Sequence, residues 1–146
     1  MASIVWIEYY GMDIEREEEE FKIAIQVVKR TNIINDFHPL ARHIRAAEIA
    51  NLKEFPVLRS SISDRFELIS TEEFNSIDEY FNFGKDRNLE YIVIDNNSNR
   101  LQFMKDIFLN EEKYDFLIKE FDSKDQGFNY HVKIFRIDYE KFDSIK

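Results

Sequence analysis

The chain of 146 residues has the length of one domain, and its 44% hydrophobic residues are sufficient to fill one core. Its 20 Lys and Arg against 29 Asp and Glu give a formal net charge of −9, which argues against nucleic acid and anionic membrane surfaces as partners. The absence of Cys excludes disulfides, thiolate metal sites and Cys nucleophiles, and 3 Gly leave little material for a glycine-rich phosphate loop.

The first elements expected are a strand and a long helix. β-branched and aromatic residues at positions 4–9 predict a strand that ends near Gly11. Apolar residues at helical spacing over 14–30, with acidic residues early and basic residues late, predict a helix capped by Asp13. The acidic run at 17–20 suits a solvated helix face better than a cation-binding patch.

A second helix and two short strands are expected next. His38 and Pro39 open a helix that ends near Asn51, because Pro fits the first turn, where its missing N–H costs nothing. Residues 55–58 contain a Pro and predict an edge strand, and residues 66–70 predict another strand.

The middle of the chain carries two sharper patterns. The S-x-x-E form of residues 76–79 is a capping box, and the helix that it begins should close near Gly84. Residues 91–95 are an apolar run ending in a carboxylate, which is typical of a strand buried on both faces of a parallel sheet. We expect this strand to be central.

The last third should hold two helices, a turn and a strand. Apolar spacing predicts helical stretches over 101–108 and 114–121, separated near Asn110. Residues 122–127 resemble a calcium loop but lack its alternating ligands, so an Asx-type turn is expected. In the strand at 130–139, apolar residues occupy both faces, which indicates a bulge or burial on two sides.

Strands that alternate with helices predict one α/β domain over residues 1–146. Its three layers would be a mostly parallel central sheet flanked by helices, with a C-terminal strand that is either parallel or antiparallel. No apolar run approaches the roughly 20 residues that cross a bilayer, and the start lacks the pattern of a signal peptide. A soluble chain that does not itself insert into a membrane is expected.

Candidate binding residues are few. Asp95 follows the central strand, where α/β sheets bind ligands, but an Asp there can equally stabilise the following turn. His38, Arg42 and Arg45 together form a candidate anion-binding face, against which stands internal pairing of the arginines with the many carboxylates. The spacing of His38 and His43 is not that of a metal site, so we expect no metal. We also expect no cofactor and no catalytic residue in this chain.

Several short sequence segments together resemble the C-terminal soluble domain of archaeal membrane mannosyltransferases of the dolichyl-phosphate-mannose type. They are spread over most of the chain, at residues 34–36, 43–48, 76–80, 91–95, 113–114 and 132–139. The resemblance implies an extracytoplasmic domain of a lipid-linked sugar transferase whose catalytic acids lie in its membrane part. No catalytic residue is therefore carried over, and this chain would be an accessory domain that contacts acceptor protein or steadies the membrane portion.

Two other classes of function remain open from the residues alone. An acidic surface and many aromatic residues suit a stand-alone cytoplasmic protein-interaction module. A small enzyme that uses Asp95 with a His or Arg near the strand ends is the third hypothesis.

Overall fold

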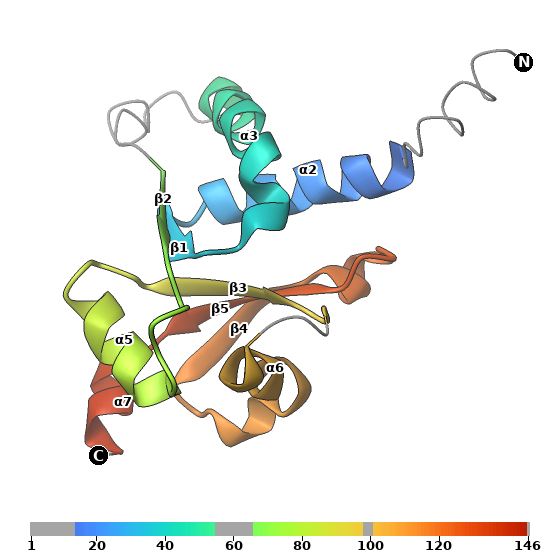
Figure 1. The fold of residues 1–146 in the computed structure, drawn as a ribbon. Helices are drawn as coiled ribbons and strands as arrows, with labels where there is room; N and C mark the ends of the chain where they lie inside the picture. Colours follow the sequence, from blue (N-terminus) through green and yellow to red (C-terminus); the bar gives the residue numbers. More distant parts are fainter. Residues whose placement is uncertain (1–13, 55–65, 98–100, 146) are drawn as a thin grey trace, which may run out of the picture.

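The structure is a computed structural model, and it describes residues 14–54, 66–97 and 101–145. In these ranges helices and strands alternate along much of the chain (Figure 1). The α-helices are α2 (Ile14–Val28), α3 (Ala41–Glu54), α5 (Ile77–Lys85), α6 (Gln102–Leu109) and α7 (Tyr139–Ser144). The strands are β1 (Ile33–Asn35), β2 (Glu67–Ile69), β3 (Tyr91–Asp95), β4 (Leu117–Asp122) and β5 (Val132–Ile137).

The strands of the described ranges form two sheets. β1 and β2 pair in parallel, and β3, β5 and β4 form an antiparallel sheet in that order. The expectation of a single, mostly parallel central sheet is therefore wrong. The expectation that residues 91–95 form its central strand is also wrong, because β3 lies at one end of the three-stranded sheet and β5 lies in the middle. The basis of both expectations was the continuous apolar run of β3, which reports burial on both faces and does not require parallel neighbours.

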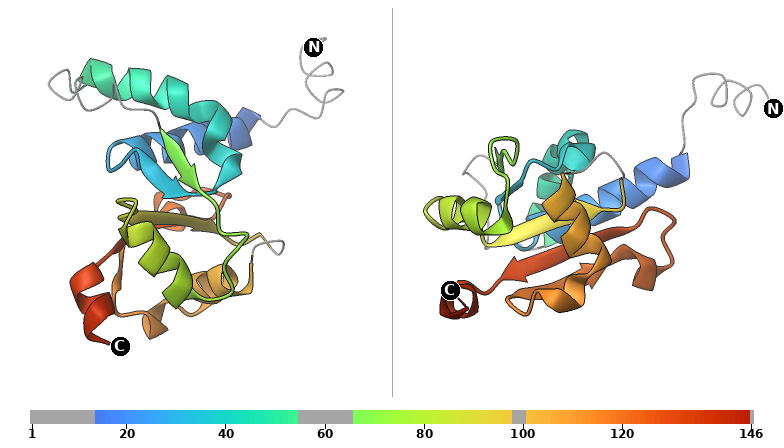
Figure 2. Two further views of the ribbon diagram at one scale, coloured as in Figure 1. Left: turned by 60° about the vertical axis from the view of Figure 1, so that its left-hand side comes forward. Right: turned by 60° about the horizontal axis from the view of Figure 1, so that its bottom comes forward.

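The three-stranded sheet lies between two hydrophobic cores. On one face, Ile92 and Phe135 pack with the residues of α5, α6 and α7. On the other face, Val93 and Ile134 pack with α2, α3 and β1. The helices consequently cover the sheet from both sides, as two views of the ribbon show (Figures 1 and 2). β5 is buried on both faces, and this explains why both of its faces carry apolar residues.

β1 is joined to β3 by a side chain. The Asn35 amide donates from Nδ2 to the Val93 carbonyl at 2.9 Å, and its Oδ1 accepts from the Val93 N–H at 2.7 Å. Both residues are buried. One amide thus satisfies both backbone polar groups of Val93.

One predicted helix is a strand. Residues 114–121 were expected to be helical, whereas Leu117–Asp122 form β4. Their apolar residues Leu117 and Phe121 are four apart, a spacing that fits a helical period and also an even step along a strand. The register of β4 against β5 shifts between Lys119 and Phe121, and so Leu117 contacts one core and Phe121 the other.

Two local predictions are confirmed. The Ser76 hydroxyl accepts from the Glu79 N–H at 3.3 Å and caps α5. The Asp122 carboxylate accepts from the Lys124 N–H at 3.0 Å, as an Asx-type turn requires. None of the helices in the described ranges is long and apolar enough to cross a membrane. The expected elements at 4–9 and 55–58, and the cap Asp13, lie outside the described residues.

Candidate functional site

A polar cleft of about 240 Å³ opens where β1 and β2 end beside β3. Residues that follow β1 and β2 line it, together with residues from the second half of β3. This edge of the strands is where α/β proteins commonly bind ligands. The lining residues are Asn35, Asp36, Phe37, His38, Thr71, Glu72, Val93, Ile94, Leu101 and Met104. We call this the strand-end cleft.

Asp36 and Thr71 hold the two polar turns of the strand-end cleft together. The Thr71 hydroxyl donates to Asp36 Oδ1 at 3.0 Å, and the Thr71 N–H donates to Oδ2 at 3.2 Å. The Asp36 N–H in turn donates to the Ile69 carbonyl at 3.0 Å, which continues the pairing of β1 with β2 by one residue. The Asp36 carboxylate is therefore fixed at the cleft and only partly buried.

Tyr80 stabilises the same turns from within the hydrophobic core. Its hydroxyl donates to the Ile69 carbonyl at 2.8 Å, and its ring is fully buried. Burial, followed by the negative charge of Asp36, raises the pKa of Tyr80 well above its usual range. Tyr80 accordingly stays protonated and remains a hydrogen-bond donor, which keeps the end of β2 in place.

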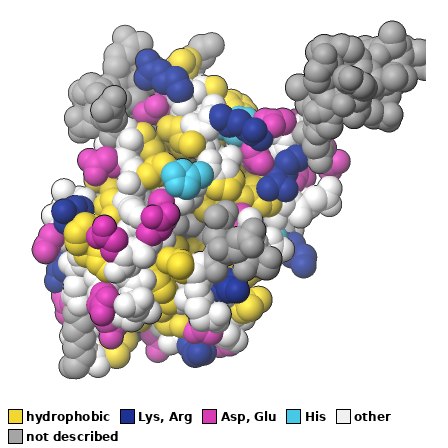
Figure 3. All heavy atoms as spheres, viewed as in Figure 1, with side chains coloured by type: hydrophobic (Ala, Val, Ile, Leu, Met, Phe, Trp, Pro, Cys, Tyr) yellow, Lys and Arg dark blue, Asp and Glu magenta, His cyan; other side chains and the backbone are white. Residues whose placement is uncertain are grey.

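The strand-end cleft is negatively charged on one side and apolar on the other. Asp36 and Glu72 are its carboxylates, His38 and Glu72 are exposed, and Leu101 and Met104 supply apolar surface. Among the described residues that line it, none is Lys or Arg. On the face of the molecule drawn in Figure 3, basic and acidic side chains are interspersed, and no broad basic patch forms. The strand-end cleft can therefore accept hydrogen bonds from a ligand, and its carboxylates disfavour the binding of an anion.

Asp95 has its own partners away from this lining. The Tyr130 hydroxyl donates to Asp95 Oδ2 at 2.6 Å, and the Asn97 N–H donates to Oδ1 at 3.1 Å. Asp95 is 3% exposed. The bond from Asn97 matches the structural interpretation of this residue, in which it stabilises the turn after the strand, and the bond from Tyr130 ties it to the residue that lies two positions before β5.

His38, Arg42 and Arg45, which were expected to form an anion-binding face, have different surroundings in the structure. His38 lines the strand-end cleft, whereas Arg42 forms ion pairs with Glu17 and Glu20 of α2. Arg45 is exposed on α3. The internal pairing that the acidic composition favoured is thus what Arg42 adopts.

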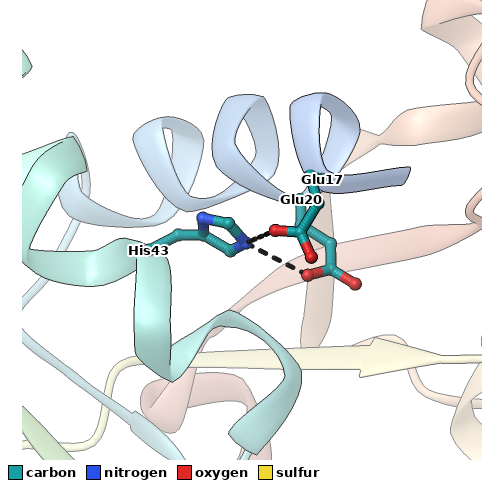
Figure 4. A group of neighbouring side chains, drawn as sticks. All are labelled: Glu17, Glu20 and His43. Atoms are coloured by element: carbon teal, nitrogen blue, oxygen red, sulfur yellow. Dashed lines mark hydrogen bonds and ion pairs between the residues drawn. The ribbon is translucent and has the colours of Figure 1, made fainter. Parts of the chain in front are cut away.

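Glu17, Glu20 and His43 form a compact group between α2 and α3 (Figure 4). His43 Nε2 lies 3.1 Å from a carboxylate oxygen of each glutamate. Such spacing suits adjacent ligands of a tetrahedral zinc ion, whose bonds are about 2.0–2.2 Å long.

Two arginines form ion pairs with the carboxylates of this group. Arg16 contacts Glu20 at 2.8 Å, and Arg42 contacts both Glu17 and Glu20. Two guanidinium charges balance two carboxylate charges, so a divalent ion would leave the group with excess positive charge unless an arginine moved away. We interpret the group as an ionic link between the two helices.

Asp36, Thr71 and Glu72 were not singled out from the sequence. The signal for Asp36 was present, because Ile33 and Ile34 form a short β-branched run that ends in Asn-Asp. Thr71 and Glu72 follow a predicted strand, but only the pairing of β1 with β2 brings them beside Asp36.

Comparison with known proteins adds no assignment. The chain matches no family model, no curated protein and no solved structure.

Proposed function

We propose that this chain is a non-catalytic soluble accessory domain of a membrane glycosyltransferase that passes a sugar from a lipid-phosphate carrier to protein. Its place would be the extracytoplasmic face of the cell membrane. Its partners would be the membrane portion of a parent protein or an acceptor protein. The sequence resemblance supplies the class of enzyme.

The observation that carries the non-catalytic part of the proposal is the state of Asp95. A general base must reach the proton that it removes, and it needs access to substrate. Asp95 is instead buried and bonded to Tyr130 and Asn97. Arg42, a candidate for binding an anionic group, is likewise held by Glu17 and Glu20.

Two measurements test this function. The isolated chain, incubated with labelled dolichyl-phosphate mannose and an acceptor peptide, should neither transfer nor hydrolyse the sugar. Sequencing the native gene upstream of the codon for Ser3 should reveal an in-frame continuation that encodes hydrophobic spans. Sugar transfer by the isolated chain, or a stop codon and promoter directly upstream, would contradict the proposal.

A protein-interaction module in the cytoplasm is the second candidate, and two exposed apolar side chains are its candidate contact points. Leu109 at the end of α6 is 72% exposed, and Ile49 on α3 is 45% exposed. If this function holds, Leu109→Ser or Ile49→Ser should weaken capture of a partner from cell extract, while Ala46→Ser, an exposed change on α3, should not. A monomer that retains no partner counts against it.

A further inference from the structure

We propose that the strand-end cleft binds an uncharged, hydroxyl-rich ring, namely one sugar unit without its phosphate. The chemical class of the ligand follows from the cleft, and the choice of mannose as the sugar rests on the proposed function. The site is distinct from Asp95 and from the group of Glu17, Glu20 and His43.

The hydrogen-bonding capacity of the cleft suits hydroxyl groups. An ionised carboxylate offers about four acceptor positions, and Thr71 uses one on each oxygen of Asp36. The remaining positions on Asp36, together with the exposed carboxylate of Glu72, can accept from sugar hydroxyls. Hydrogen bonds to charged acceptors are stronger than those between neutral groups, so they can offset the loss of water from the sugar.

Charge decides against a phosphate or carboxylate ligand. Asp36 and Glu72 both carry negative charge, and the described lining offers no Lys or Arg to offset it. An anionic group placed here would meet two like charges at close range.

The volume and the apolar residues of the cleft suit a single sugar ring. The volume of about 240 Å³ lies below the range of roughly 300–1,000 Å³ typical of sites for drug-sized molecules. Leu101, which is 38% exposed, gives the cleft apolar surface that can pack against the C–H face of a sugar ring, and the nearly buried Met104 lies beside the cleft.

Titration of the ¹⁵N-labelled chain with methyl α-mannopyranoside, followed by NMR, tests the inference. We expect shifts centred on the amides of Asp36, Thr71 and Val93, with a Kd in the millimolar range because the ligand is small. Mannose 1-phosphate should bind at least about 10-fold more weakly, owing to like-charge repulsion. Shifts confined to other surfaces, or equal or tighter binding of the phosphate, would overturn the inference.

Variants separate the cleft from general effects. Glu72→Ala should weaken binding of methyl mannoside by about 5-fold or more, whereas Glu112→Ala, which removes an exposed carboxylate from the 3₁₀ turn after α6, should leave it unchanged. Asp36→Asn should reduce the discrimination against mannose 1-phosphate, and its thermal melt shows whether the fold survives. Unchanged binding in Glu72→Ala together with unchanged discrimination in a folded Asp36→Asn would overturn the inference.

The two proposals fail separately. If methyl mannoside binds in the cleft and the native gene encodes no hydrophobic spans, the sugar site stands and the accessory function falls. If the gene encodes the spans and the isolated chain is inactive, yet no sugar binds, the function stands and the sugar site falls.

Discussion

At the scale of single residues, Asn35 links the two-stranded sheet to the three-stranded sheet. Its amide supplies both hydrogen bonds to the backbone of Val93 and so brings the end of β1 against the middle of β3. The strand-end cleft lies at this junction. A buried amide with both partners satisfied fixes one arrangement, because any shift leaves polar groups unpaired.

Replacement of Asn35 should therefore be costly. Asn35→Ala leaves the N–H and carbonyl of buried Val93 without partners, at about 1–3 kcal/mol each, so a loss of about 2–6 kcal/mol in the free energy of unfolding is expected. Urea denaturation measures it. Asn75→Ala, at an exposed position, is the matched control and should change stability by no more than about 0.5 kcal/mol. Equal stability of both variants would show that the amide does not join the strands.

Asp106 gives a pH-dependent prediction. Hydrogen bonds from Tyr114, Asn110 and Lys113 lower its pKa to about 2 from 3.8. A carboxyl whose pKa is lower in the folded state adds stability above its unfolded pKa, and this stability is lost as the pH falls from about 4 to about 2. The melting temperatures of the wild type and Asp106→Asn should differ at pH 6 and converge near pH 2.

Asp115→Asn, a change at an exposed position, provides the control. Its melting temperature should stay close to that of the wild type. A gap between wild type and Asp106→Asn that persists at pH 2 would show that the charge of Asp106 is not the source of its effect.

At the scale of elements, α2 and α3 are linked by an ionic group as well as by their apolar faces. Glu20 has a side chain only 5% exposed, and it contacts Arg16, Arg42 and His43. We expect Glu20→Ala to cost about 1–3 kcal/mol of stability, less than a fully buried pair, because both arginines remain in contact with water. Urea denaturation at low and high salt is the measurement.

The exposed pair of Glu18 and Lys22 on the same helix serves as the comparison. Its atoms are 3.4 Å apart and Glu18 is 62% exposed, so Glu18→Ala should cost no more than about 0.5 kcal/mol, and salt should remove even that. If the two glutamate variants behave alike, the link between α2 and α3 is only a surface ion pair.

Elements with local signals could be predicted from the sequence. The capping box marked the start of α5, and the apolar run marked the bounds of β3. β1 was missed because three residues are too short for a periodic pattern, and β4 was assigned as a helix because its apolar spacing fits both periods. His38 was named as a site residue, but its neighbours in the cleft depend on strand pairing, which local pattern does not encode.

At the scale of the whole molecule, the two cores share one sheet. Ile134 packs on the core of α2 and α3, and the adjacent Phe135 packs on the core of α5, α6 and α7. Damage to either core should therefore weaken the strand on which the other rests. This arrangement favours unfolding of the described part in a single cooperative step.

Ile134→Ala and Phe135→Ala test that coupling. Each should lower the free energy of unfolding by about 2–5 kcal/mol, and each should unfold in one transition that far-UV circular dichroism and tyrosine fluorescence report at the same urea concentration. Leu109→Ala, at a position 72% exposed, is the control and should remain close to the wild type. Separate transitions for the two probes would show that the cores unfold independently.

The shift in register within β4 also affects how copies of the chain meet. β4 ends the order of the three-stranded sheet, so one side of it has no strand partner among the described residues. Free strand edges act as templates for fibrous aggregation, and an irregular, charged edge suppresses it. Lys119 and Glu120 lie at the irregularity itself and are both exposed in the fold. We therefore expect the irregular, charged edge of β4 to disfavour pairing between the sheets of two copies when the protein is concentrated.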